Sequence, residues 1–185
     1  AHTTSPFVTA YPWSGGFGSK YTNPSTLPAA TSQANGVKFH PAGNALAVAS
    51  DASPFIQVYA WGGSFGSKFA DPSTLPVGSA RSAVFSPSGA EIVVGHGSTP
   101  FVSAYPWFSG FGTKYANPAT LPAGYATGVA FNPAGTAVAV SHGNSPCISV
   151  YPWSAGFGTK YANPATLPST NGLGVAFHPS GSVLA

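Results

Sequence analysis

The sequence has very few charged side chains. Only 5% of its 185 residues are Asp, Glu, Lys or Arg, against roughly a quarter in an ordinary soluble domain. Salt-bridge networks therefore cannot organise the surface. Six basic residues outnumber three acidic ones and give a formal net charge of +3. They are spread along the chain, and so thin a positive field excludes a groove for nucleic acid.

Methionine is absent, and Cys147 is the only cysteine, which excludes an intramolecular disulfide. No run of 18 apolar residues occurs, and no basic stretch followed by an apolar one opens the sequence, so neither a membrane span nor a signal peptide is predicted. The low charge and the lack of methionine favour an extracellular or virion setting. Hydrophobic residues make up 43% and aromatic residues 14%, which predicts a folded protein.

Repetition is what the chain has in abundance. The stretch from Gly110 to Pro122 has near-copies at 16–28, 64–76 and 156–168, and all 19 prolines fall into five recurring positions. The period is 46 residues, marked by one phenylalanine per repeat at Phe39, Phe85, Phe131 and Phe177. Two extra residues in the first repeat lie within 29–36, which places an insertion in a connecting loop.

This period, with short apolar runs between Gly and Pro turns, is typical of a β-propeller blade. The 23 glycines and 19 prolines would break any long helix. We therefore predict an all-β propeller of four-stranded antiparallel blades, about 46 residues each, with four blades in this chain. One repeat supplies strands near 128–132, 137–141, 147–151 and 157–162. Proline at the exit of the fourth strand suits an outer edge.

The predicted domain is a single propeller, or half of one, over 1–185. Its repeats are 36–81, 82–127, 128–173 and a split blade made of 1–35 plus 174–185. Ring closure would complete the split blade within one chain or between chains. Propellers have about four to eight blades, and two chains giving eight blades, or a longer parent chain, are favoured over a four-membered ring. The first predicted partner is therefore the protein itself.

The segments Gly-Val-Ala-Phe-Asn-Pro-Ala-Gly at 128–135 and Ser-Ala-Val-Phe-Ser-Pro-Ser-Gly at 82–89 resemble the first strand and turn of WD40-type repeats. The family's Trp-Asp pair is replaced by Tyr105-Pro106 and its counterpart at 151–152, and its Gly-His pair is missing. The chain is thus identified as a divergent, highly repetitive WD40-like or YVTN-like propeller of the type found in bacterial and phage proteins.

Side chains that could carry chemistry are few and do not form a catalytic pattern. The histidines fall into two repeated positions, His2, His96 and His142 in one, His40 and His178 in the other. Equivalent positions on successive blades diverge, so turn or packing roles are favoured over a metal site. The carboxylates Asp51, Asp71 and Glu91 do not pair in the repeat, and Asp71 is predicted to cap a turn before proline. Cys147 replaces a phenylalanine, which indicates the core.

Two kinds of side chain recur in every repeat and are the candidate binding residues. One tryptophan follows each third strand, at Trp13, Trp61, Trp107 and Trp153. Such a ring can stack on a sugar or fill the space between blades. One lysine follows in each fourth strand, at Lys20, Lys68, Lys114 and Lys160. It could meet an acidic partner or guard an exposed sheet edge.

The predicted function is a non-catalytic structural or interaction scaffold that binds through equivalent loops with avidity. The alternative is a multivalent carbohydrate-binding propeller that uses one tryptophan per blade. We expect no enzyme activity, no cofactor and no metal, because paired acids, metal-ligand spacing and a nucleophile with its base are all missing. Besides the chain itself, the expected partners are a protein or a glycan, without nucleic acid or a membrane span.

Overall fold

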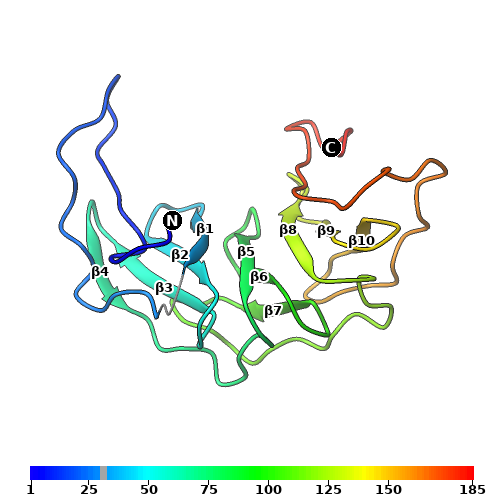
Figure 1. Ribbon diagram of the computed structural model, residues 1–185, viewed down its shortest axis with the longest axis horizontal. Coiled ribbons are helices and arrows are strands. Elements are labelled where there is room, and N and C mark those ends of the chain that lie inside the picture. Colours follow the sequence, from blue (N-terminus) through cyan, green and yellow to red (C-terminus); the bar gives the residue numbers. More distant parts are fainter. Residues whose placement is uncertain (30–32) are drawn as a thin grey trace.

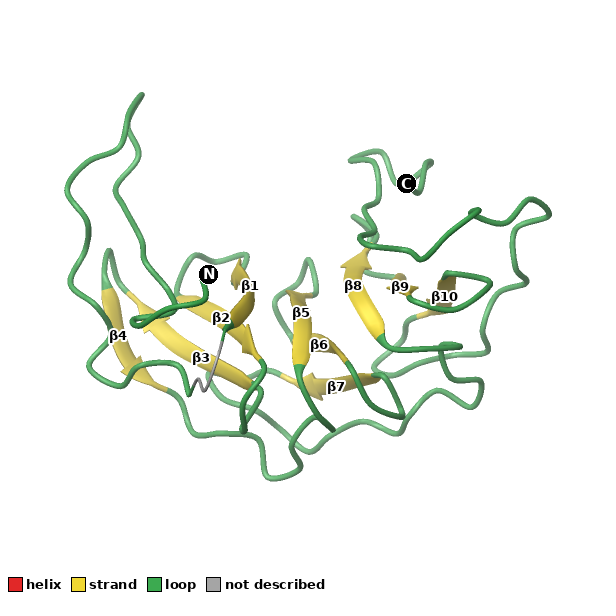
Figure 2. Ribbon diagram, viewed as in Figure 1, coloured by secondary structure: helices red, strands yellow, loops and turns green. Residues whose placement is uncertain are grey.

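The computed structural model describes residues 1–29 and 33–185, which contain ten β-strands and no helix (Figure 2). The strands are β1 (Ala34–Phe39), β2 (Ala45–Ser50), β3 (Ile56–Trp61), β4 (Phe65–Lys68), β5 (Ala80–Phe85), β6 (Glu91–His96), β7 (Val102–Pro106), β8 (Ala126–Phe131), β9 (Ala137–His142) and β10 (Ile148–Pro152). The insertion predicted within 29–36 includes 30–32, which lie outside the described residues. In the described part of the chain, no helix has the length and apolar character needed to span a membrane.

The strands form three antiparallel sheets. The first is ordered β1-β2-β3-β4, the second β5-β6-β7 and the third β8-β9-β10. The first strands of neighbouring sheets contact one another, so the sheets stand side by side in an open crescent (Figure 1). The predicted all-β class with antiparallel blades is confirmed, and β4 lies on the outer edge of its sheet, as predicted.

Among the described residues, only the first sheet has a regular fourth strand, which corrects the prediction that every blade has four. In the other two sheets the fourth segment makes an isolated bridge, Trp107 with Phe111 and Trp153 with Phe157. The carbonyl oxygen of Pro106 accepts from the fourth segment, 2.9 Å from the amide nitrogen of Gly112. In an antiparallel strand, the backbone N–H and C=O of one residue point toward the same neighbouring strand. Pro106 has no N–H to donate to the fourth segment, whereas its counterpart Ala60 in the first sheet has one.

Neighbouring sheets pack through two unlike faces. We call one the small face; in the first sheet it carries Ala45, Ala47 and Val58. The other, the aromatic face, carries a tyrosine and a tryptophan; in the second sheet these are Tyr105 and Trp107. The small face of each sheet packs against the aromatic face of the next. The central strands β2 and β9 are buried along their whole length, because a neighbour covers each side of them.

The two ends of the chain do not complete a fourth sheet, so the predicted four blades reduce to three sheets and two partial segments. At the N-terminal end, Val8 packs on the first sheet and Trp13 bridges Phe17 in a short hairpin. At the C-terminal end, Phe177 bridges Leu184. Among the described residues, no strand pairing joins these segments, and Figure 1 shows them at opposite ends of the crescent.

Candidate binding site

Successive antiparallel strands place alternate turns on the same edge of a blade. The turn between the first and second strands therefore lies beside the turn between the third and fourth. In the second sheet these turns span 86–90 and 107–110. Each is a backbone-bonded turn, because the amide of Gly89 donates to Ser86 O and that of Phe108 to Gly110 O. Short, closed turns on a packed sheet give fixed positions to any side chain they carry.

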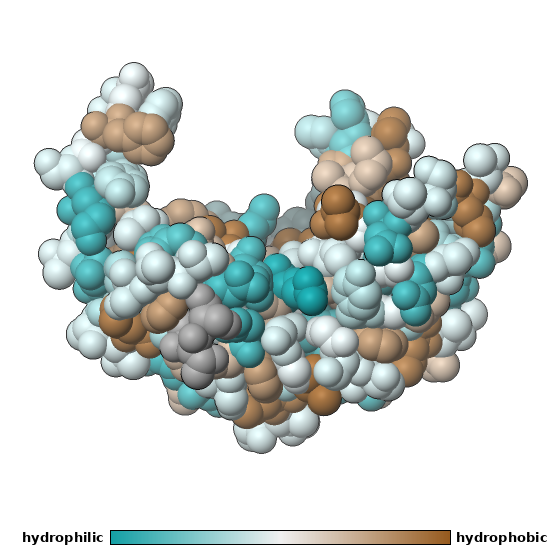
Figure 3. All heavy atoms as spheres, viewed as in Figure 1, coloured by the Kyte–Doolittle hydropathy of each residue, from teal (hydrophilic) through white to brown (hydrophobic). Residues whose placement is uncertain are grey.

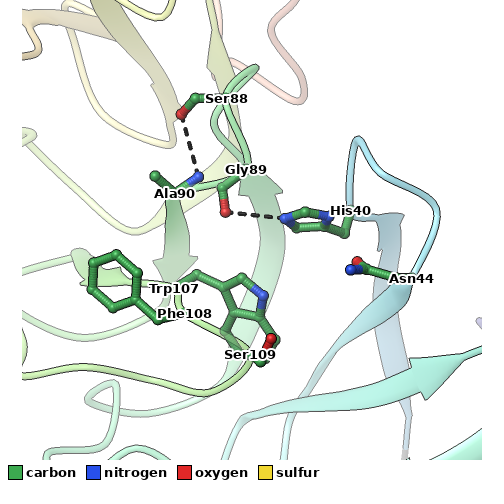
Figure 4. A pocket seen from close by; sticks show the side chains of 8 residues that line it. All are labelled: His40, Asn44, Ser88, Gly89, Ala90, Trp107, Phe108 and Ser109. Atoms are coloured by element: carbon green, nitrogen blue, oxygen red, sulfur yellow. Dashed lines mark hydrogen bonds between the residues drawn. The ribbon is translucent and has the colours of Figure 1, made fainter.

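A notch opens on this edge between the first and second sheets. Its cavity volume is about 250 Å³. The lining residues are His40, Asn44, Ser88, Gly89, Ala90, Trp107, Phe108 and Ser109, which come from turns of both sheets (Figure 4). Imidazole, amide and hydroxyl groups thus lie beside the edge of an indole ring. A mixed polar and aromatic lining of this kind is typical of recognition surfaces.

His40 connects the two walls of the notch. Its Nε2 lies 3.0 Å from the carbonyl oxygen of Gly89, and its Nδ1 lies 3.2 Å from the amide nitrogen of Ala42. A carbonyl can only accept and a backbone amide only donate. These contacts fit a ring that donates from Nε2 across the junction between the sheets and accepts at Nδ1.

Phe108 is an exposed lining residue of the notch, with 77% of its surface accessible, and its ring points away from His40 (Figure 4). The equivalent position is Ser14 in the N-terminal segment, Gly62 in the first sheet and Ser154 in the third. Three of four repeats therefore form the same turn without a ring, so packing does not require one. The ring is a break in the repeat pattern of the sequence, but Phe108 was not among the predicted binding residues.

The four predicted tryptophans occupy unlike environments. Trp107 and Trp153 are only 5% and 6% exposed, Trp61 is half-buried, and Trp13 is 69% exposed. Trp107 lies in an aromatic box, with ring centroids 5.1 to 5.6 Å from those of Phe69, Phe85 and Phe111 in edge-to-face contacts. Edge-to-face contacts of this kind stabilise beyond the area they bury. These indoles fill the space between blades, and a sugar could not stack on Trp107 or Trp153 without displacing neighbouring rings.

The four predicted lysines make the same local contact in each repeat. Each ammonium donates to the side-chain oxygen three residues further along the chain, through the pairs Lys20 with Asn23, Lys68 with Asp71, Lys114 with Asn117 and Lys160 with Asn163. Asp71 was predicted to cap a turn before proline, and its carboxylate accepts from the ammonium of Lys68 instead. These contacts close the bend where the chain leaves the outer segment, and each lysine belongs to a different repeat.

The repeated histidine position is internal. His96 Nε2 lies 3.0 Å from Ser103 Oγ, and His142 Nε2 lies 3.1 Å from Ser149 Oγ. The first sheet has Ser50 with Gln57 in the same places, 3.3 Å apart. Burial lowers the pKa of His96 to about 4, opposed by backbone hydrogen bonds, and it lowers the pKa of His142 as well. Both imidazoles are therefore neutral at pH 7.

The remaining candidate groups each have separate surroundings and do not form a common site. Asp51 accepts from the amide of Gln33 at 3.1 Å, Glu91 accepts from Ser88 at 3.4 Å, and Cys147 is buried. Within 1–29 and 33–185, no three His, Cys, Asp or Glu side chains gather closely enough to hold a metal ion.

No family model matches the sequence, and no curated protein matches it. Solved structures do match the fold. A chain of a structure titled "Crystal Structure of Mitotic Checkpoint Complex" is 16% identical with a TM-score of 0.61, and the match covers 83% of this chain and 47% of the other. Hydrazine synthase from Kuenenia stuttgartiensis is 15% identical with a TM-score of 0.63, covering 82% and 40%.

A putative 6-phosphogluconolactonase from Bacteroides uniformis is 15% identical with a TM-score of 0.66, and the match covers 95% of this chain and 55% of that one. The chain therefore spans about half the length of the solved structures it matches. At such identities the likeness concerns the fold alone. Together with the three sheets and their packing, it shows a propeller-like all-β fold.

Proposed function

We propose that the protein is a non-catalytic interaction scaffold that binds a protein partner through the turns at its blade junctions. The observation that carries this proposal is Phe108, an exposed ring beside a polar notch, at a turn position where the other repeats have serine or glycine. Aromatic side chains beside a pocket are common anchors in protein interfaces. The divergent bacterial or phage type and the extracellular or virion setting stay predictions.

The rigidity of the junction supports this role. The notch has walls from two sheets that share a continuous apolar core, and the imidazole of His40 bonds one wall to the other. A site fixed before binding loses little conformational entropy when a partner docks. The same pair of turns recurs at the junction of the second and third sheets, so a repetitive partner would gain from avidity. The junction of the first and second sheets would be the strongest of these sites, because its turn carries the exposed ring of Phe108 where other repeats have serine or glycine.

The carbohydrate-binding alternative has less support from the geometry. It needs one accessible indole per blade, whereas Trp107 and Trp153 are buried against aromatic neighbours. Only Trp13 presents most of its ring to solvent. A glycan site would therefore rest on that single residue, without the multivalency that the sequence pattern predicts.

The test uses peptides displayed on phage, selected on the immobilised 185-residue chain. Peptides that use the notch should bind the Phe108→Ser variant at least about 30-fold more weakly, since a central aromatic anchor contributes about 2 kcal/mol or more. Serine occupies this position in two other repeats, so the variant should fold. A Leu173→Ser variant, at another exposed apolar residue, is the matched control.

Equal binding by the Phe108→Ser variant, or no selected peptide at all, would contradict the proposal. A panel of sugars followed by tryptophan fluorescence tests the alternative. A sugar response that disappears in Trp13→Ala and persists in Phe108→Ser would support the carbohydrate-binding function instead.

A further inference from the structure

The two ends of the crescent carry complementary halves of one blade interface. The N-terminal hairpin exposes its aromatic face: Tyr11 is 45%, Trp13 69% and Phe17 80% exposed. In the sheets, residues at the equivalent positions pack against the small face of the preceding sheet. In the third sheet, the part of the small face on β10 has no aromatic face of a following sheet packed against it. Figure 3 shows hydrophobic atoms at both ends, bordering the open side of the crescent.

On the third sheet, that uncovered part forms an apolar groove. Its cavity volume is about 620 Å³. The groove is lined by Ile148, Val150, Ala162, Pro164, Thr166, Leu167, Pro168, Leu184 and Ala185. Ile148 and Val150 are half-buried here, whereas their counterparts Val102 and Ala104 in the second sheet are fully buried under the third. The groove therefore corresponds to the place where a third and fourth strand would lie.

We propose that residues 1–21 of a second copy of this chain fill that groove, and that the reciprocal contact closes a two-chain ring. The repeat itself supplies the template for each contact. At the two junctions between sheets, Tyr105 Oη donates to Thr74 O at 2.8 Å and Tyr151 Oη donates to Thr120 O at 2.9 Å. At the junction with the N-terminal segment, the hydroxyl of Tyr59 has no hydrogen-bond partner among the described residues. The next members of these series are Tyr11 and Thr166, one at each end of the crescent. Thr166 lines the groove.

The aromatic boxes give a second, independent match. Trp153 is enclosed by Tyr115 from the preceding repeat and by Phe131 and Phe157 from its own. Trp13 has only Phe17 beside it, at 5.2 Å between centroids. The two rings missing from its box correspond to Tyr161, which is 53% exposed, and Phe177, both at the other end of the chain.

Backbone pairing completes the fit. In the second sheet Ile92 pairs with Tyr105 and Val93 with Ala104. The same register in the split blade would pair Leu184 with Tyr11 and Ala185 with Ala10 of the second copy. The segment that contains Leu184 bridges Phe177 on one side, and among the described residues nothing pairs with its other edge. Adding a strand there would satisfy its free backbone groups.

A second copy is favoured as the occupant by the curvature of the crescent. The two ends lie apart on the open side (Figure 1), so the chain's own hairpin does not reach its groove. A head-to-tail contact that closes after two copies makes a discrete dimer rather than an open fibre.

The test is the mass of the 185-residue chain in solution, measured by light scattering over a dilution series. The expected mass at high concentration is twice 18.5 kDa. Trp13→Ala should weaken the association at least about 30-fold, as for loss of a central aromatic anchor. Tyr11→Phe should weaken it about 10-fold through loss of the hydroxyl donor. Both side chains are exposed in the single chain, so these variants should fold.

An acceptor-side variant and a mixing experiment make the result specific. Tyr161→Ala should weaken association as Trp13→Ala does. An equimolar mixture of the two variants should associate more tightly than either alone, because one of its two interfaces keeps both rings. The proposal is overturned if the mass stays at one chain at every concentration, if the dimer survives both substitutions, or if the mixture gains nothing. Phe108→Ser should leave the mass unchanged, which separates this test from that of peptide binding.

Discussion

Replacing Trp107 with alanine is expected to destabilise the fold by about 3 to 5 kcal/mol, as for other large aromatic rings removed from a core. The ring is 5% exposed and contacts three aromatic side chains, one of which, Phe69, belongs to the preceding sheet. Its removal would leave a cavity between two sheets that are each fixed by their own strand pairing. The change should appear as a lower midpoint of urea unfolding, measured by circular dichroism.

The matched control is Trp13→Ala, which removes the same side chain from the same repeat position. Because Trp13 is 69% exposed, we expect a change within about 0.5 kcal/mol, as for ordinary surface substitutions. Urea unfolding of both variants should be measured at protein concentrations below the dissociation constant of the dimer, so that only the single chain is compared. Comparable losses in the two variants would show that the four tryptophans are equivalent, contrary to the structure.

Acidification is expected to destabilise the protein between pH 6.5 and pH 4 through His96. The unfolded chain takes up a proton near the ordinary pKa of 6.5, whereas burial keeps the folded imidazole neutral until about pH 4. The stabilising effect is fully present above pH 6.5 and is lost as the pH falls through the folded pKa. A shift of this size corresponds to about 3 kcal/mol. His142 contributes in the same direction, because its pKa is also lowered.

The chain offers its own replacement for this pair. The first sheet uses Ser50 and Gln57 where the second uses His96 and Ser103. The double substitution His96→Ser with Ser103→Gln should therefore fold and should lose about 3 kcal/mol less stability between pH 6.5 and pH 4 than the parent. Urea unfolding at a series of pH values measures this difference. An unchanged pH dependence in the double variant would mean that another group is responsible.

The sequence predicted the fold class well because its repeats place apolar runs, turns and prolines in register. Strands predicted at 128–132, 137–141 and 147–151 correspond to β8, β9 and β10. The fourth strand was overpredicted. Its apolar residues recur in every repeat, but regular pairing needs a backbone donor that Pro106 and Pro152 lack. Ala60 stands at the position where the other three repeats have proline. It belongs to the sheet in which the described residues form a regular fourth strand.

The candidate sites were harder to predict, because repetition makes core, surface and functionless residues recur alike. Trp13 and Trp107 have the same place in the repeat, yet one lies in solvent and the other in a closed aromatic box. The difference depends on whether a neighbouring sheet is present in space, which a local pattern does not contain. Phe108 breaks the repeat pattern in the sequence, but its exposure depends on the direction of a turn, which the pattern does not contain.

By itself the sequence determined the all-β class, the 46-residue period and the alternation of strands and turns. Those features follow from local backbone preferences and short-range chemistry. Only the tertiary structure decided how many sheets are complete, which indoles are buried, where a notch opens, and which faces at the two ends lack a neighbour. These depend on contacts between repeats, where the same residue is core or surface according to what packs against it.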